Sequence, residues 1–232
     1  MITSGPEFVV FIDHPSKKQV PDHEIEIARR RIERLGGKVV WSVAGSLLKY
    51  HPDVRYVSRL RKQGFDLALH LSPGYIGLHR TTLATGVPEG KIREAVLGAM
   101  RMVDGARYLT TCGPLHTAIF TGKVPRRGWK DDLGPELHPS VVHALGKTAK
   151  DVGLTVLIGV RSPDWIRNVL EELGAPYVEG VGIDRYTIDD EDPAKAAEMV
   201  ADGECEAVIV HPQKDTFRRL HEFTTELKKL LE

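Results

Sequence analysis

Four apolar stretches in this chain of 232 residues end in side chains that can bind a metal ion or transfer a proton. These side chains belong to Asp13 with His14, His70, Asp184 and His211. Carboxylates and imidazoles act as general acids and bases, and they also bind borderline cations such as zinc. Strands of a β/α barrel carry their reactive residues at their C-terminal ends, so these residues occupy the positions that such a fold uses for chemistry.

Strand-like apolar runs alternate with helix-like segments along the whole chain. The runs are rich in Val, Ile and Leu, which is typical of parallel strands that are covered on both faces. The predicted strands are Phe8–Asp13, Lys38–Gly45, Asp66–Leu71, Ala106–Cys112, Thr155–Val160, Pro176–Asp184 and Glu206–His211. The predicted helices are Asp22–Leu35, Pro52–Gln63, Glu89–Val103, Pro139–Val152, Pro163–Leu173, Pro193–Asp202 and Asp215–Leu231.

Alternation of strand and helix leaves two architectures, an open doubly wound sheet and a closed barrel. The polar residues at several strand ends favour the barrel, because closure would make them converge. No G-x-G-x-x-G follows the first strand, so the dinucleotide-binding form of the open sheet lacks its fingerprint. We therefore predict an α/β fold, a seven-stranded β/α barrel that forms a single domain over residues 1–232.

The composition is that of a soluble globular protein, with 41% apolar and 28% charged residues. Lys and Arg balance Asp and Glu at 32 each, so no overall charge attracts nucleic acid or an anionic membrane. The sequence shows no signal peptide and no apolar segment of the roughly 20 residues that cross a bilayer. Cys112 and Cys205 lack metal or redox spacing and fit free thiols in a reducing compartment. We expect a cytoplasmic protein without nucleic-acid or membrane partners.

Asp13, His14 and Pro15 lie where the first predicted strand meets its loop. The carboxylate and the imidazole could accept a proton and hold a cation. Alternatively, Asp13 could close a turn before the proline. The residues alone leave both interpretations open.

His211 gives the strongest single signal. Apolar residues lead into it, and Pro212 prevents the strand from continuing. A histidine buried there only for packing would need a polar partner, whereas a general acid at the strand end would not. His70 stands between two leucines, so it could be a bonded core histidine or, if a turn follows it, a residue at the barrel rim.

The remaining candidates have structural alternatives of similar weight. His79 and His116 lie in predicted loops and could be ligands or structural residues. Trp165 follows Asp164, which the sequence favours as the start of a helix. Asp184 lies beside Arg185 and could serve in a surface ion pair.

The stretch Gly113–His138 is predicted to be the longest irregular segment of the chain. Loops of that length in compact domains are usually functional or mobile. The stretch contains a basic patch, Lys123–Arg127, that could contact phosphate or form a solvated loop.

The order of these features resembles the polysaccharide deacetylase (NodB-homology) superfamily, and its divergent branch above all. The resemblance implies a distorted (β/α)7 barrel, in agreement with the seven predicted strands. The similar segments are Phe11–His14, Gly37–Gly45, His51-Pro52-Asp53, Gly64, His70, Ser162–Trp165 and Val208–Leu220.

The resemblance also implies a role for each matching residue. Asp13 would be the general base, and His211 the general acid. His14 and His70 would bind a divalent metal, with Zn²⁺ the expected ion, and Ile209 would lie beside the acyl methyl group. A register shifted by one residue would make Asp13 the ligand, but the first register keeps both residues chemically competent.

Two positions depart from the family pattern. Gly74 stands where the family has its second metal-binding histidine, and Thr111–Pro114 replaces its arginine-proline block. The site could recruit His79 or His116 instead, bind metal weakly, or have lost catalysis.

The resulting expectation is a metal-dependent hydrolase that removes an acyl group from an N-acylated sugar or a small amide. Trp165, Asp184 and His116 are expected to contact this substrate. One alternative is a metal-dependent phosphoesterase, although its D-x-H-x-H start is missing. Another is a non-catalytic relative that binds a sugar or nucleotide, and a homo-oligomer is compatible with the sequence.

Closure of the barrel makes a geometric prediction. Asp13, His14, His70 and His211 should line a single pocket, with His211 one substrate atom back from the metal. The stretch Gly113–His138 should fold over the pocket as a wall or lid.

Overall fold

The computed structural model describes residues 7–13, 22–44, 54–71, 78–101, 103–128, 130, 132–184, 187–211 and 214–232. The strands of its main sheet are β1 (Val9–Asp13), β2 (Lys38–Ala44), β3 (Asp66–Leu71), β4 (Tyr108–Thr111), β7 (Thr155–Gly159), β8 (Tyr177–Gly182) and β9 (Ala207–Val210). A separate antiparallel pair consists of β5 (Lys123–Arg127) and β6 (Asp132–Glu136). The helices are α1 (Asp22–Arg34), α3 (Val54–Lys62), α4 (Arg80–Thr85), α5 (Glu89–Met100), α6 (Gly113–Thr121), α7 (Pro139–Val152), α8 (Asp164–Leu173), α9 (Pro193–Ala201) and α10 (Lys214–Leu231).

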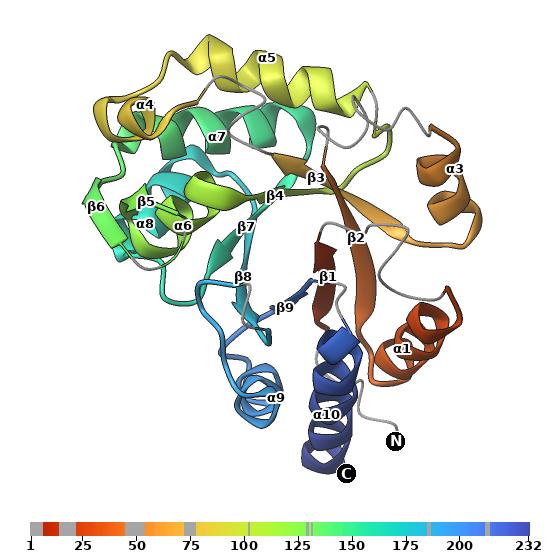
Figure 1. Cartoon of the computed structure of the whole chain (residues 1–232). Helices are drawn as coiled ribbons and strands as arrows, with labels where there is room; N and C mark the ends of the chain where they lie inside the picture. Colours follow the sequence, from red (N-terminus) through yellow and green to blue (C-terminus); the bar gives the residue numbers. More distant parts are fainter. Residues whose placement is uncertain are drawn as a thin grey trace. The chain divides into compact units, whose positions relative to one another are not determined.

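The main sheet is a closed barrel in the strand order β1-β2-β3-β4-β7-β8-β9 (Figure 1). The pairings β1–β2, β1–β9, β3–β4, β4–β7 and β8–β9 are all parallel. The predicted seven-stranded α/β barrel is therefore confirmed. Each predicted strand overlaps a strand of the barrel, because a continuous Val/Ile/Leu run can be buried on both faces only in such a sheet.

The chain divides into two compact units. The first contains the described residues between 7 and 42 together with those from Glu179 to Glu232. The second contains the described residues from Val43 to Val178. The first unit thus combines the two ends of the sequence.

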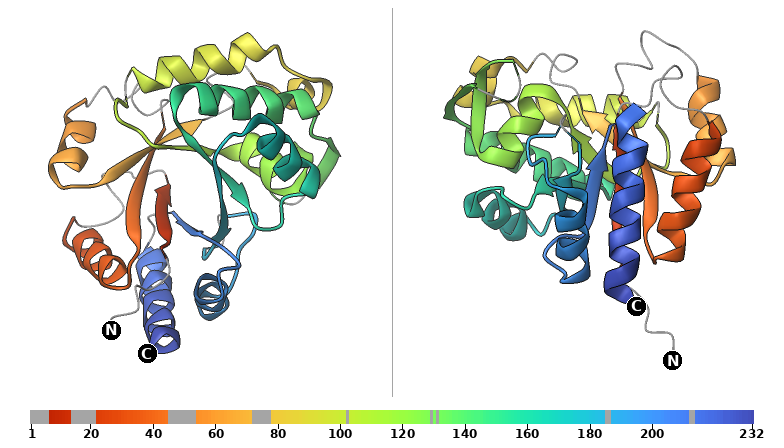
Figure 2. Two further views of the ribbon diagram at one scale, coloured as in Figure 1. Left: turned by 180° about the vertical axis from the view of Figure 1, so that it is seen from behind. Right: turned by 60° about the horizontal axis from the view of Figure 1, so that its bottom comes forward.

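In the first unit, β1 pairs with β2 on one side and with β9 on the other, and β8 pairs with β9. Helix α10 packs against α9 and α1 (Figure 2). Helix α1 buries Ile25, Ala28 and Ile32, which recur at the spacing of one helix face. Phe8, beside β1, contacts Phe223 of α10 edge to face with ring centres 5.9 Å apart. Apolar contacts therefore tie the helices of this unit to its strands.

In the second unit, α7 packs between α5 and α8. Its N-cap is His138, whose side chain accepts a hydrogen bond from the backbone of Ser140, and Gly153 ends it in the left-handed conformation at φ 73°. Pro139 begins the helix, where its missing N–H costs nothing. These capping residues explain why the predicted bounds of α7, Pro139–Val152, agree with the structure.

The stretch Gly113–His138, predicted to be irregular, is instead helix α6 followed by the β5–β6 hairpin. Helix α6 is buried around its circumference from Leu115 to Phe120, so its sequence lacks the polar face that predicts an amphipathic helix. Gly122 ends the helix at φ 71°. The expectation that this segment forms a lid stays a prediction.

The basic patch Lys123–Arg127, expected in a loop, forms strand β5. Lys123 is the register partner of Glu136, and Arg127 is that of Asp132. Opposite charges facing across a strand pair stabilise the pairing. A second difference is the short helix α4 in the predicted loop before Pro88.

No helix among the described residues is both long enough and apolar enough to span a membrane.

Substitution of Gly37 tests the packing of the core of the first unit. A Cβ atom there would lie 2.4 Å from Cζ of Phe8 and 2.7 Å from Cγ2 of Ile32, both of which are buried. Overpacking should make Gly37→Ala less stable by about 1–3 kcal/mol in urea unfolding. The control, Gly98→Ala, adds a methyl group that meets nothing within 4 Å and should gain about 1 kcal/mol of helix propensity. Wild-type stability of Gly37→Ala would contradict this packing.

Candidate active site

The register of the first unit places polar residues side by side at the ends of its strands. Asp13, the last residue of β1, is the register partner of Ser42 on β2. On the other side of β1, Ile12 is paired with Val210, so the next position along both strands brings Asp13 opposite His211. A carboxylate, a hydroxyl and an imidazole therefore meet at the C-terminal ends of three neighbouring strands.

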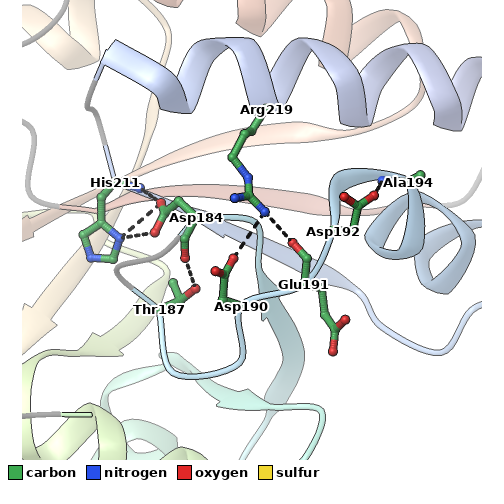
Figure 3. Close-up of polar contacts among 8 residues, drawn as sticks. All are labelled: Asp184, Thr187, Asp190, Glu191, Asp192, Ala194, His211 and Arg219. Carbon is green, nitrogen blue, oxygen red and sulfur yellow. Dashed lines mark hydrogen bonds and ion pairs between the residues drawn. The ribbon is translucent and has the colours of Figure 1, made fainter. Parts of the chain in front are cut away.

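Asp184 adds a second carboxylate from the segment that follows β8. Its Oδ2 accepts a hydrogen bond from the backbone N–H of His211, and Nδ1 of His211 lies 3.3 Å from both carboxylate oxygens (Figure 3). The side chain of Asp184 is 4% exposed and that of His211 is 19% exposed. With Nδ1 facing a carboxylate, the ring holds a proton on that nitrogen and directs Nε2 away from Asp184.

The surroundings of Asp13 and His211 raise the pKa of both groups. Burial raises the pKa of Asp13 from 3.8 to about 6, although the positive charge of His211 and the Ser42 hydroxyl lower it and the charge of Asp184 raises it further. Burial alone lowers the pKa of His211. The hydrogen bond with Asp184 and the charges of Asp13 and Asp184 outweigh burial, so the net pKa of His211 is raised.

This arrangement can move protons in both directions. A carboxylate with a pKa near 6 is a stronger base than an ordinary aspartate, and it still loses its proton at neutral pH. A histidine with a raised pKa retains its proton closer to neutral pH and can donate it from Nε2. Asp13 and His211 therefore lie together, and their roles as base and acid stay predictions.

His70 and His116 belong to the second unit. His70 is buried at the end of β3, and its Nδ1 lies 2.7 Å from Oγ1 of Thr110, its register partner on β4. His116 lies within α6, where its Nδ1 is 3.2 Å from the carbonyl oxygen of Thr111 and its ring stacks on Phe120 at 4.0 Å. A shared pocket for His70, Asp13 and His211 stays a prediction, since these residues belong to different compact units.

The other predicted residues lie in different elements of the fold. His79 is exposed immediately before α4, and Trp165 is half-buried in the first turn of α8, close to Gly122. Ile209 is fully buried on β9, opposite Phe11 in the register of the sheet. His14 lies outside the described residues. Ligand or substrate roles for these residues stay predictions.

A metal site needs several donor side chains in one place. Among the described residues, no cluster of three His, Cys, Asp or Glu side chains could hold a metal ion. The predicted ligand set includes His14, which the structure does not describe, and Gly74, the departure from the family pattern, is likewise outside the described residues. The divalent metal stays a prediction.

Sequence reasoning missed Ser42 and the contact between Asp184 and His211. Ser42 stands among apolar residues of its strand, and a single hydroxyl there carries little signal. It could have been found by aligning the predicted ends of the first two strands, because the register pairs it with Asp13. Asp184 was expected to contact substrate, and nothing in the sequence specifies that its carboxylate faces His211.

Comparisons with known proteins show the fold. No protein-family model matches the sequence, and no curated protein matches it. The lactam utilization protein from Thermus thermophilus is similar in structure, with a TM-score of 0.63, 12% sequence identity and coverage of 97% of this chain and 96% of that chain. At this identity the likeness shows that the two proteins share a fold.

Two weaker likenesses have TM-scores below 0.5. A mutant of a CE4-family pseudoenzyme with restored enzymatic activity gives a TM-score of 0.47 at 12% identity, over 99% of this chain and 64% of that chain. A peptidoglycan deacetylase from Bdellovibrio bacteriovorus gives a TM-score of 0.41 at 10% identity, over 98% of this chain and 50% of that chain.

The raised pKa of Asp13 predicts a stability effect with a definite sign. In the unfolded chain Asp13 has its ordinary pKa of 3.8, so between that value and about 6 the folded protein binds more protons and loses stability as pH rises. Asp13→Asn removes this penalty and should be more stable than wild type above pH 6, by up to about 3 kcal/mol. The difference should vanish below about pH 4.

Urea unfolding of both proteins across this pH range measures the effect. Asp104→Asn is a suitable control, because the Asp104 side chain is 91% exposed. This control removes only an exposed charge and its surface ion pair with Arg61, so it should change the stability little. Equal stability of Asp13→Asn and wild type at pH 8 would show that Asp13 carries no such penalty.

Proposed function

We propose that the protein is a hydrolase that removes an acyl group from an N-acylated sugar or a small amide. The observation that carries this proposal is the position of a buried carboxylate, Asp13, next to His211 at neighbouring strand ends, where a second carboxylate, Asp184, orients the histidine. This pair provides a base and an acid that can act in the same turnover. The acyl substrate rests on the resemblance to polysaccharide deacetylases.

The proton transfers follow from the site. The Asp13 carboxylate takes a proton from water as the water oxygen forms a bond to the carbonyl carbon of the substrate. The imidazolium of His211 then donates its Nε2 proton to the amide nitrogen as the carbon–nitrogen bond breaks. The products are a carboxylic acid and an amine, and the proton held by Asp13 returns to His211 or to solvent.

Asp184 supports the acid without exchanging a proton itself. Its carboxylate faces Nδ1 of His211 at 3.3 Å and stabilises the protonated ring. Because Nδ1 is held in this way, Nε2 is the nitrogen that faces away from the carboxylate and can reach a leaving group. Loss of this contact should weaken the acid more than the base.

A divalent metal ion such as Zn²⁺ belongs to the proposal, with His14, His70 and His79 as its proposed ligands. When bound, it would polarise the substrate carbonyl and lower the pKa of the attacking water. The described donors do not form a complete ligand set, and the proton transfers above involve only Asp13, His211 and water.

Substitution of Asp13 and His211 tests whether both groups are needed for activity. Asp13→Asn and His211→Ala should each lower kcat on an acetyl-amide substrate by about 10²–10⁴-fold with the fold retained. The control His143→Ala, at an exposed position of α7, should keep wild-type activity. Activity that persists in both site variants would rule out this mechanism. A protein that hydrolyses p-nitrophenyl phosphate but no acetyl amide would indicate the phosphoesterase instead.

The pH profile gives a further test of the same roles. Activity should rise as Asp13 loses its proton near pH 6 and should fall at higher pH as His211 loses its proton. Asp184→Asn removes the hydrogen bond that raises the pKa of His211, so the alkaline limb should move to lower pH while the acid limb moves little. An unchanged alkaline limb would mean that His211 is not the acid.

Elemental analysis of the purified protein tests the metal. We expect one divalent ion per chain and a fall in melting temperature after chelation, because a ligand that binds only the folded state stabilises it. His70→Ala should abolish both the bound ion and the effect of chelation on the melting temperature. Absence of metal, together with no rise in melting temperature on adding Zn²⁺, would favour the non-catalytic binding relative.

A further inference from the structure

The segment between β8 and α9 carries Asp184 and returns to the strand that it leaves. Gly182, the last residue of β8, donates its backbone N–H to the carbonyl of Asp189 at 3.0 Å. The carbonyl of the same glycine accepts from the backbone N–H of Glu191 at 2.8 Å. The segment is therefore closed at its base on a single residue of the barrel.

Thr187 fixes the backbone of Asp184 from inside this closed segment. Its hydroxyl donates to the carbonyl oxygen of Asp184 at 2.8 Å, and its backbone N–H donates to the same oxygen at 3.2 Å (Figure 3). Thr187 is fully buried. A Cβ atom on Gly182 would lie 1.6 Å from Oγ1 of Thr187, so only glycine leaves room for the hydroxyl.

Arg219 holds the far side of the segment from α10. Its Nη2 donates to the carbonyl oxygen of Glu191 at 2.9 Å and lies 3.4 Å from Oδ1 of Asp190. The next residue, Asp192, caps α9 by accepting from the backbone N–H of Ala194 at 2.9 Å. The segment is thus attached to two helices as well as to the barrel.

These attachments matter because the segment is strongly acidic. Asp184, Asp189, Asp190, Glu191 and Asp192 lie within nine residues that contain one cation, Arg185, so the segment carries an excess of like charges that repel one another. The cation of Arg219 offsets part of this repulsion at Asp190. Fixing the backbone at Asp184 keeps its carboxylate aimed at His211 when electrostatic repulsion would favour a more open segment.

We infer that Thr187 and Arg219 are positioning residues, which hold Asp184 against His211 so that Nε2 of the histidine faces away from the carboxylate. The inference rests on the proposed function only in giving His211 the role of acid. The structural part of the inference is independent of any substrate. It states that the orientation of His211 depends on the segment between β8 and α9, which carries Asp184.

The titration of the His211 ring by NMR tests the inference without substrate. Two groups facing the ring, Asp184 and Asp13 of β1, contribute to its raised pKa. Thr187→Val keeps the shape of the side chain but removes the hydroxyl, so Asp184 should loosen and the pKa of His211 should fall. Thr187→Ser keeps the hydroxyl, so the pKa of His211 should stay at its wild-type value. His211→Gln assigns the signal among the ten histidines.

The matched control is Thr224→Val on α10. Thr224 is also buried and also donates its hydroxyl to a backbone carbonyl, that of His221 at 3.1 Å. This variant should leave the titration of His211 unchanged. In an Asp184→Asn background, Thr187→Val should have no further effect on the His211 pKa, because the group that it positions has lost its charge.

A folded Thr187→Val protein with the wild-type His211 pKa would overturn the inference for Thr187. If that variant does not fold, Arg219→Gln decides in its place, with the same direction expected and an unchanged titration counting against positioning. A protein that shows these pKa changes but hydrolyses no amide would retain the positioning and lose the proposed function. Where activity is present, Thr187→Val should lower kcat about tenfold or more with KM nearly unchanged.

Discussion

The pairing of β1 with β2 and β9 is the constraint on which the candidate site depends. Side chains alternate between the two faces of a strand, so a slip of one residue would move Asp13 to the opposite face of the sheet. The buried residues Phe11 and Ile12 resist such a slip, because it would exchange the surroundings of every apolar side chain on the strand. The register that buries the core therefore also brings Asp13 beside Ser42 and His211.

The fold was largely predictable from sequence, and the site only in part. Val/Ile/Leu runs indicated the strands, and glycine and proline marked most helix ends. Helix α6 was not predicted because it is buried on all sides and so lacks a polar face. Strand β5 was not predicted because its charged residues suggest a loop, and only the register shows that they lie opposite acidic residues of β6, thirteen or fewer positions away. The individual residues Asp13 and His211 were visible as polar ends of apolar runs. Their partners Ser42 and Asp184 were not assigned these contacts, since register and loop conformation decide them.

The candidate site also shows a conflict between stability and chemistry. A carboxylate as buried as Asp13 favours the protonated form, yet a base must be able to lose its proton. The charge on His211 reduces this conflict, and Asp184 in turn supports that charge. Sites of this kind are maintained at the expense of stability, which apolar packing elsewhere in the first unit, such as that of Phe8, Ile32 and Phe223, must supply.

The first unit consists of two segments that are far apart in the sequence, and this affects how the protein folds during synthesis. Strand β1 is synthesised almost two hundred residues before its partner β9. Contacts between such distant segments form slowly, because a long chain must be closed before they gain any stability. On the ribosome, β1 must remain without its neighbour while the whole second unit is translated, and its apolar residues are then open to chaperones and to aggregation. The proton-transfer pair can therefore form only after the second unit has been synthesised.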